Sequence, residues 1–407
     1  MSDRKANAIT DEASNLFSAS KESVFQIRVI DLASGEKSST GSGFYINPDG
    51  MVATNYHVVS DYVFKPDRYS ITYIDNGKSV ELKLLDIDVI HDLALLTSPE
   101  KKEIYLKLGE SNMPKGERIF SMGNPHDLGM SIIEGTYNGI MQNSTYRKIL
   151  FSASLNPGMS GGPAINHKGE VVGINVSTQG NDVSFLIPVE FLNELLRRER
   201  PSENLSEKNW FALIEKNLVE NQTVYINDLL GKDWPKLTLD GYLIPGEISE
   251  NIKCWGQTQD TEKSKVSMIL TKCQSVDWIY LSNEFITFYF SYWFTHNKGK
   301  GISTYRLYNH LQENFENSFS FENEDTEAST KFQCSTEFTE IAGESWKTAF
   351  CVRQYKQFKY LYDINLVIST VDKPKEGIVG GFLAMGVTQE KSDELIKKFL
   401  KEIVWKK

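Results

Sequence analysis

A serine flanked by glycines lies in the sequence Asn-Pro-Gly-Met-Ser-Gly-Gly-Pro-Ala at residues 156–164. Glycines allow positive backbone φ angles and let a substrate come close to the backbone. A tight turn of this kind can aim the N–H groups of Gly158 and Ser160 at one point, where they would stabilise an oxyanion. The pattern is typical of a nucleophilic serine, although an ordinary Gly/Pro/Ser turn has the same composition.

A nucleophilic serine needs a base, because its hydroxyl reacts poorly until a neighbouring group takes its proton. Histidine is the side chain that accepts a proton near neutral pH. His57 is the candidate, since it follows the apolar run at residues 51–54 and is flanked by apolar residues. A lone histidine in such a place is more often structural than catalytic, so the base has to be judged together with its acid.

The candidate acid is Asp92, which opens the apolar strand at residues 93–96. A carboxylate at the edge of a core needs a hydrogen-bonding or cationic partner. His57 could be that partner. Two points stay open. His91 could be no more than a neighbour of Asp92 in the sequence, and Asp88 could be the acid in place of Asp92.

The three candidates follow one another as His57, Asp92 and Ser160, which is the order found in chymotrypsin-type enzymes. Seven segments add motifs to this order, at residues 41–44 (GSGF), 54–59 (TNYHVV), 92–96 (DLALL), 122–125 (MGNP), 156–163 (NPGMSGGP), 171–175 (VVGIN) and 185–188 (FLIP). Taken together they resemble a trypsin-like serine protease of the bacterial HtrA (Deg) type, over about residues 20–195.

The resemblance implies an all-β fold of two six-stranded antiparallel barrels, with the active site in the cleft between them. Ser160 would be the nucleophile, and His57 the general base and then acid. Asp92 would hold the imidazole tautomer and stabilise the imidazolium. The N–H groups of Gly158 and Ser160 would form the oxyanion hole, with the Met159 N–H in the same turn. No metal and no cofactor are expected.

Met159 departs from the family pattern, which usually has Asn or Asp before the serine. Trypsin-type zymogens use an acid there to pair a newly cleaved N-terminus, and methionine cannot form that pair. We therefore expect any regulation to come from loops, oligomerisation or the second half of the chain.

The resemblance also places a specificity pocket, and none of its residues is charged. A buried Lys or Arg side chain would need a carboxylate partner, so cleavage is expected after small or medium apolar residues. The alternative is that Ile174 or Leu155 fills the pocket and leaves a poor protease. The floor would be Ser154, followed by Leu155, and one wall would be residues 173–177, with Gly173, Ile174 and Asn175 as its first residues.

Three regions are predicted along the chain. Residues 1–200 would be the protease domain, with a helix at 8–20 before its strands and another at 188–200 after them. Residues 201–240 would be a linker, centred on 201–204, and a helical connection that includes a helix at 206–220. Residues 241–407 would form a separate α+β domain. Its predicted elements are a strand at 285–294, a helix at 302–315, strands at 331–339, 346–354, 360–371 and 377–386, and a helix at 389–405 capped by Thr388 or Ser392.

The second half resembles no family that we recognise. HtrA proteins usually carry PDZ domains in this place, and no convincing PDZ pattern is present, which argues against peptide-gated regulation of the HtrA kind. The four cysteines of the chain all lie here, at Cys254, Cys273, Cys334 and Cys351. None forms a C-x-x-C pair of the kind that binds zinc. We expect the local disulfides Cys254–Cys273 and Cys334–Cys351, with four buried free thiols as the alternative.

Composition excludes some classes of partner. The net charge of −10 is shared equally by the two halves, so no basic region favours nucleic acid. No apolar run approaches the length of a membrane span. The first residues show no signal peptide, which indicates either a cytoplasmic protein or one numbered after signal removal. Paired cysteines and the HtrA resemblance favour the periplasm or cell envelope of a bacterium.

The sequence therefore predicts a serine endopeptidase that forms an acyl-enzyme and acts on protein or peptide substrates. Two other functions remain open: an inactive protease scaffold that acts as a binding protein, and an esterase that uses the same site. A homo-oligomer also remains open.

Overall fold

The computed structural model describes residues 3–178, 183–199, 210–262, 264–283, 285–318 and 327–405. The chain divides into two compact units. The first unit comprises residues 1–210 and 279–285, and the second comprises residues 211–278 and 286–407. The short segment 279–285 therefore belongs to the first unit, although its neighbours in sequence on both sides belong to the second. The predicted linker at 201–204 lies outside the described residues.

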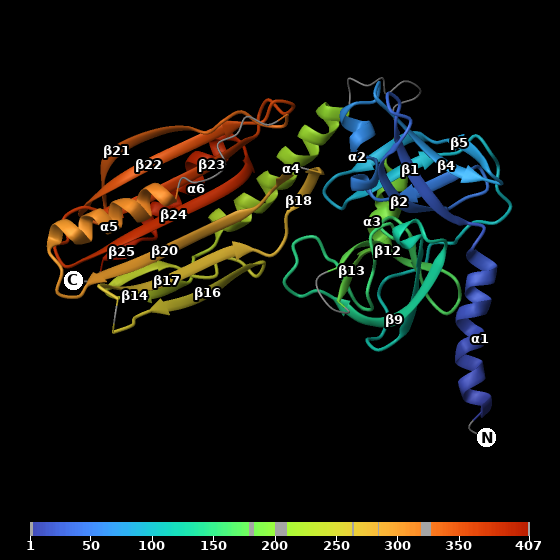
Figure 1. The fold of residues 1–407 in the computed structure, drawn as a ribbon, viewed down its shortest axis with the longest axis horizontal. Helices are drawn as coiled ribbons and strands as arrows, with labels where there is room; N and C mark the ends of the chain where they lie inside the picture. Colours follow the sequence, from blue (N-terminus) through green and yellow to red (C-terminus); the bar gives the residue numbers. More distant parts are fainter. Residues whose placement is uncertain are drawn as a thin grey trace. The chain divides into compact units, whose positions relative to one another are not determined.

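An antiparallel sheet of seven strands begins the first unit (Figure 1), in the order β5-β4-β1-β2-β3-β7-β6. Helix α2 (Tyr56–Phe64) follows β3 directly. The strands are β1 (Val24–Asp31), β2 (Lys37–Tyr45), β3 (Met51–Thr54), β4 (Tyr69–Asp75), β5 (Lys78–Glu81), β6 (Lys83–Asp88) and β7 (Leu93–Thr97).

A closed barrel of six strands follows, in the order β10-β13-β12-β11-β8-β9. The short helix η1 (Pro125–Asp127) lies between β8 and β9, and α3 (Val189–Arg197) comes after the last strand. The strands are β8 (Arg118–Gly123), β9 (Ser131–Ile140), β10 (Ile149–Ser152), β11 (Pro163–Ile165), β12 (Val171–Thr178) and β13 (Ser184–Pro188).

The expected pair of six-stranded barrels is thus found as one closed barrel and one seven-stranded sheet with two edges. Strands β5 and β6 are those edges. Only Leu82 separates them in sequence, and within residues 24–97, all of which the structure describes, no ladder joins them. One closed six-stranded antiparallel barrel was thus predicted correctly, whereas closure of the first barrel was not.

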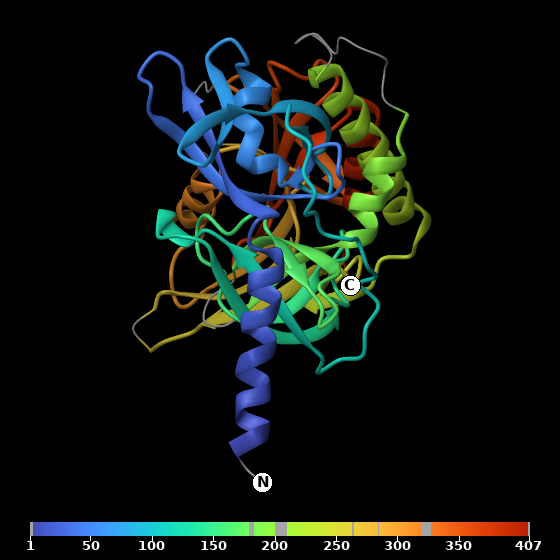
Figure 2. The same ribbon diagram turned by 90° about the vertical axis from the view of Figure 1, so that its right-hand side faces the viewer.

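Helix α1 (Asp3–Ser20) starts earlier than the predicted helix at 8–20. Its last turns pack Ala13, Leu16 and Phe17 against the apolar core that holds Phe44, Phe120 and Ile174, while its beginning runs away from the sheets (Figure 2). None of the helices in the described part of the chain is long and apolar enough to cross a membrane.

The second unit is built on another antiparallel sheet, in the order β16-β17-β20-β24-β23-β22-β21. Helix α4 (Trp210–Gly231) precedes it, and a small sheet of three strands accompanies it. The strands of the large sheet are β16 (Ile252–Gln259), β17 (Val266–Ser275), β20 (Phe290–Gly299), β21 (Gln333–Ile341), β22 (Glu344–Gln354), β23 (Tyr362–Thr370) and β24 (Glu376–Val387); those of the small sheet are β14 (Lys236–Leu239), β15 (Tyr242–Pro245) and β25 (Val404–Trp405). A further sheet of two strands is formed by β18 (Ile279–Ser282), which belongs to the first unit, and β19 (Phe285–Thr287).

The two remaining helices cover opposite faces of the large sheet. Successive side chains along a strand point to opposite faces, so the side chains that each helix contacts identify the face that it covers. On β20 and β24, Trp293 and Val379 pack with α5 (Thr304–Asn317). Their neighbours Phe294 and Phe382 instead contact Phe399 of α6 (Gln389–Lys401). Helix α6 is capped by Thr388, whose hydroxyl accepts the N–H of Lys391. Thr388 is one of the two caps that the sequence predicted.

The predicted single strand at 285–294 is wrong, because the structure has two strands, β19 and β20, with Phe288 between them. Phe288 adopts a φ of 58°, which a regular strand cannot contain. Its side chain is buried and contacts Tyr225 of α4 and Phe290. Packing of this aromatic side chain thus accompanies a break that the apolar pattern does not reveal.

Both expected disulfides are present. Cys254 lies opposite Cys273 on β16 and β17, and Cys334 lies opposite Cys351 on β21 and β22. The sulfur atoms are 1.98 Å and 1.99 Å apart. The structure thus pairs the four cysteines as expected, with no free cysteine among the described residues.

Candidate active site

His57 and Asp92 are held together by backbone and side-chain contacts at once. His57 lies in the first turn of α2, and Asp92 lies between β6 and β7 with a φ of 54°. The Asp92 carbonyl accepts hydrogen bonds from the Asn55 side chain and from the Tyr56 N–H, at 2.9 Å and 3.2 Å. Its carboxylate accepts the His57 N–H at 2.8 Å and lies 2.7 Å from Nδ1 of the same residue.

This geometry fixes the state of the imidazole. The carboxylate can accept from Nδ1 only if Nδ1 carries the proton, so Nε2 is left as the basic nitrogen. Burial lowers the pKa of His57, but the charge of Asp92 and its hydrogen bond outweigh burial and raise that pKa above its ordinary value. His57 is therefore both oriented and made more basic by one carboxylate.

The rival acid Asp88 has partners of its own. Its carboxylate lies 2.9 Å from Nδ1 of His91 and 2.7 Å from the guanidinium of Arg198. Burial raises the pKa of Asp88, yet these two partners together hold it below its ordinary value. His91 stacks on Phe191 with the ring centroids 3.7 Å apart. The pair Asp88–His91 is thus separate from the pair Asp92–His57.

The turn that carries Ser160 requires glycine at two positions, 158 and 161. Gly158 has a φ of 95°, and a Cβ there would lie 2.4 Å from the carbonyl oxygen of Asn124. Gly161 has a φ of 83°, and a Cβ there would lie 2.2 Å from Oγ1 of Thr54. The turn is therefore pressed against the end of β3, two residues before the helix that carries His57 begins. The carbonyl of Ser160 also accepts the N–H of Ser42, at 2.7 Å.

The peptide groups of this turn point in defined directions. The carbonyl of Pro157 accepts the N–H of His126 at 2.8 Å. In a trans peptide the following N–H, that of Gly158, points the opposite way. The Gly158 carbonyl in turn accepts a hydrogen bond from the hydroxyl of Ser42 at 2.7 Å. His126 of η1 and Ser42 of β2 thus set the orientation of the peptides on both sides of Gly158.

Two of the three N–H groups expected at the oxyanion hole have no acceptor among the described residues, namely those of Gly158 and Ser160. The N–H of Met159 donates to the carbonyl of Asn156 at 3.1 Å. The hydroxyl of Ser160 donates to the carbonyl of Val176, also at 3.1 Å. Within the described structure its hydrogen bond therefore goes to Val176 and not to Nε2 of His57.

The residues expected around the specificity pocket differ in their surroundings. Ser154 is half-buried, whereas Leu155 and Ile174 lie in the apolar cores. Gly173 pairs with Ala164 and Pro188 inside the barrel. The side chain of Ser177 lies outside the described residues.

Asn175 supports the serine turn from behind. Its side-chain amide donates to the carbonyls of Met122 and Met159, at 3.0 Å and 3.1 Å, and accepts the hydroxyl of Ser121. The side chain is completely buried. Sequence reasoning placed Asn175 in the pocket wall and did not foresee this role.

Sequence reasoning also missed Ser42 and Tyr280. Ser42 lies in the motif at 41–44, so the motif gave a signal for its importance but not for its contact with Gly158. Tyr280 belongs to the segment 279–285 and lies beside His57, with ring centroids 5.7 Å apart. None of the seven motif segments quoted from the sequence contains it.

One group of described residues in the second unit has the composition of a metal site: Asp240, His296 and Glu376. Their ligand atoms lie within 4.8 Å of one another. The two carboxylates face opposite nitrogens of the imidazole, Asp240 at Nδ1 and Glu376 at Nε2. Since one metal ion can bind only one of these nitrogens, the arrangement fits a histidine between two acids better than a three-ligand centre.

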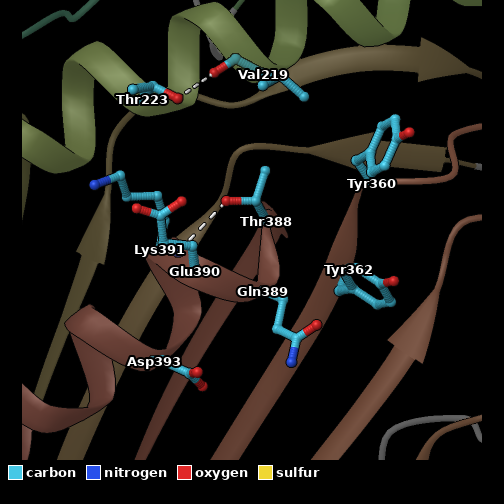
Figure 3. A pocket seen from close by; sticks show the side chains of 9 residues that line it. All are labelled: Val219, Thr223, Tyr360, Tyr362, Thr388, Gln389, Glu390, Lys391 and Asp393. Atoms are coloured by element: carbon cyan, nitrogen blue, oxygen red, sulfur yellow. Dashed lines mark hydrogen bonds between the residues drawn. The ribbon is translucent and has the colours of Figure 1, made fainter.

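An open hollow in the second unit, shown in Figure 3, lies between α4 and the start of α6. Its walls mix both charges with hydroxyl groups, and the hydroxyls of Thr223 and Thr388 are engaged with the backbone of Val219 and Lys391. The nine lining residues include no histidine and no cysteine. The hollow therefore offers no activated nucleophile comparable to Ser160.

Comparison with known proteins places the likeness in the first half of the chain. Residues 41–174 match the family model of a trypsin-like peptidase domain. A probable periplasmic serine endoprotease, DegP-like, from Brucella suis is 38% identical over 160 residues, which cover 36% of this chain and 30% of that protein. Serine protease HTRA1 from Xenopus tropicalis is 28% identical over 221 residues, which cover 51% and 46%.

Among solved structures, that of Deg5 covers 46% of this chain and 92% of its own, with 27% identity and a TM-score of 0.40. The chain spans less than half the length of the curated relatives named above. The N-terminal half of this chain is thus similar to trypsin-like peptidase domains and to proteins named as DegP-like and HTRA1 serine proteases.

Proposed function

We propose that this protein is a serine endopeptidase in which His57, Asp92 and Ser160 act as a catalytic triad. The observation that carries the proposal is the double contact of Asp92 with the backbone and ring of His57, beside a serine turn with two N–H groups that have no acceptor among the described residues. One side of the site is oriented for proton transfer, and the other is oriented to stabilise an oxyanion.

The reaction follows from these positions. The Ser160 hydroxyl turns from Val176 toward Nε2 of His57, which takes its proton while Oγ attacks the scissile carbonyl. The carbonyl oxygen becomes an oxyanion that accepts hydrogen bonds from the N–H groups of Gly158 and Ser160. The imidazolium, stabilised by Asp92, then protonates the leaving amine. Water, deprotonated by His57, hydrolyses the ester formed on Ser160.

The specificity proposal rests on the absence of charge. Ser154 and the described wall residues 173–176 carry no ionisable side chain, so a basic substrate side chain would find no counter-ion among them. We infer a preference for small or medium apolar residues before the cleaved bond.

The relatives and the cysteines support a location. Several relatives are named as probable periplasmic endoproteases, and two disulfides persist in an oxidising compartment such as the periplasm. We infer that the protein works in the bacterial cell envelope on protein or peptide substrates.

Purified full-length protein incubated with casein tests the activity. The expected result is cleavage by the wild type and none by Ser160→Ala, a variant whose fold is checked by circular dichroism. Hydrolysis of simple esters without any cleavage of casein or of a peptide library would favour the esterase alternative. A folded protein that cleaves neither class would favour the inactive binding scaffold.

A further inference from the structure

The segment 279–285 packs along the helix that carries the proposed base. Ile279 and Leu281 are buried, with exposed fractions of 1% and 0%. The hydroxyl of Tyr56, itself completely buried, donates to the carbonyl of Leu281 at 2.9 Å. Tyr56 and His57 are the first two residues of α2. The segment is therefore fixed to the turn from which the His57 side chain projects.

Tyr280 brings an aromatic ring next to the imidazole. Its ring plane stands at 70° to that of His57, with the centroids 5.7 Å apart, and at 71° to that of Tyr56, with the centroids 6.4 Å apart. An imidazole bonded only at Nδ1 can still rock about that hydrogen bond and move Nε2. A ring placed beside it restricts this movement.

The far end of the Tyr280 ring is fixed as well. Its hydroxyl donates to Oδ1 of Asn283 at 2.9 Å and lies 3.4 Å from the hydroxyl of Ser60, which itself donates to the carbonyl of His57. The Asn283 amide donates to Asp61 of α2 at 3.3 Å. These contacts tie the ring to α2 at two further positions, so the ring and the imidazole keep a constant relation.

Burial raises the pKa of Tyr280 to about 12, with smaller contributions from the charges of Asp61 and Asp92. The phenol therefore stays protonated at neutral pH and remains a hydrogen-bond donor. A neutral ring also removes water from beside His57 without adding a charge, and loss of water favours the neutral imidazole.

We propose that Tyr280 is a positioning residue for His57, holding the imidazole in place and shielding it from water. This inference rests on the proposed function of His57 as the base. The segment also has a consequence for the whole chain: a peptidase domain of the first 200 residues alone would lack this ring, because residues 279–285 are embedded in the sequence of the second unit.

The first test measures the imidazole itself and does not need an active enzyme. Histidine labelled with ¹⁵N gives six side chains to follow in the full-length protein, and a His57→Gln variant identifies the signals of His57. In Tyr280→Ala more water reaches the imidazole, so its titration midpoint should rise by about 0.5 pH units or more. Tyr280→Phe keeps the ring and should move the midpoint by less. Tyr305→Ala, at an exposed tyrosine of α5, should leave it unchanged.

The second test measures the rate at which a fluorophosphonate modifies Ser160. A displaced base slows this reaction, and misplacement of about 1 Å can cost about 100-fold, so we expect a loss of about 10-fold or more in Tyr280→Ala. With a peptide substrate the loss should appear in kcat and not in KM. Tyr280→Leu replaces Tyr280→Ala under the same criteria if the alanine variant does not fold.

An unchanged midpoint together with an unchanged labelling rate in a folded Tyr280→Ala or Tyr280→Leu would overturn the role of Tyr280 and leave the triad intact. Failure of the wild type to react with the fluorophosphonate would instead refute the proposed function, while the histidine titration would still decide whether Tyr280 controls the imidazole.

Discussion

The protonation of His57 sets the pH dependence of the proposed reaction. Only neutral imidazole can take the serine proton, and Asp92 raises the pKa of His57 above its ordinary value of about 6.5. Activity should therefore be lost as pH falls through this raised pKa and should reach half its plateau above pH 6.5. The pH profile of kcat/KM on a peptide substrate measures it.

Replacement of the acid gives the matching prediction. Asp92→Asn removes the charge, leaves burial as the main influence on His57, and should move the midpoint of the profile below that of the wild type. It also favours the wrong tautomer, so kcat should fall by about 10⁴-fold. His91→Gln, in the neighbouring pair with Asp88, is the control that should leave the profile as it is. If Asp92→Asn and the wild type had the same pH profile, Asp92 would not be the acid that acts on His57.

Substrate preference is also decided by single residues. Peptide-library profiling should show Val, Ala, Leu or Ile before the cut, because Ser154 and the described wall residues offer no carboxylate to a basic side chain. A dominant Arg or Lys at that position would show that the pocket is formed by other residues.

At the scale of elements, strand β2 sets the shape of the serine turn through Ser42. Its hydroxyl donates to the Gly158 carbonyl and accepts the N–H of Asn124, at 2.7 Å and 3.0 Å. Ser42→Ala leaves both groups without this partner, which should cost about 1–3 kcal/mol of unfolding free energy. It should also lower kcat by about 10-fold or more, because the Gly158 peptide can then turn away from the oxyanion.

Urea denaturation and peptide kinetics measure the two effects of Ser42→Ala. Ser39→Ala is the matched control, on the same strand but away from the serine turn, and should change neither quantity appreciably. A Ser42→Ala variant as active and as stable as Ser39→Ala would contradict the role given to β2.

The local parts of this site could be predicted from the sequence, whereas the contacts between distant segments could not. A serine turn that requires glycines at Gly158 and Gly161 leaves a recognisable sequence motif, and the proximity of Asp92 to His57 was also expected from the sequence. The family resemblance placed Asn175 in the pocket wall. Its contacts with the serine turn were missed because strand alternation alone does not tell which buried amide will hold a neighbouring loop. Tyr280 left no signal, since its role depends on a segment that comes from the sequence of another unit.

The fold shows the same division. Apolar patterns predicted β21, β22, β23 and β24, and a threonine cap predicted the start of α6, whereas no strand was predicted where β14 to β17 lie. The break at Phe288 was missed because a φ of 58° at an apolar residue depends on its packing with Tyr225. The open edge between β5 and β6 was missed because strand patterns do not determine whether a sheet closes.

At the scale of the whole molecule, reductant should lower the stability of the second unit and leave that of the first unit unchanged. Both lie in the second unit, at separations of 19 and 17 residues, and the first unit contains no cysteine. Each bond should contribute about 3 kcal/mol to the stability of the second unit. Calorimetry with and without reductant should show one transition shifted to lower temperature. An unchanged thermogram, with reduction confirmed by mass, would contradict this division.

The central claim is that Ser160 is a nucleophile activated by His57. Intact mass spectrometry after exposure to a fluorophosphonate at neutral pH tests it most directly. We predict one adduct per chain, located on the peptide that contains Ser160, and none in Ser160→Ala, with a much slower reaction in His57→Gln. No adduct on the folded wild type, or an adduct that persists in Ser160→Ala, would contradict the claim.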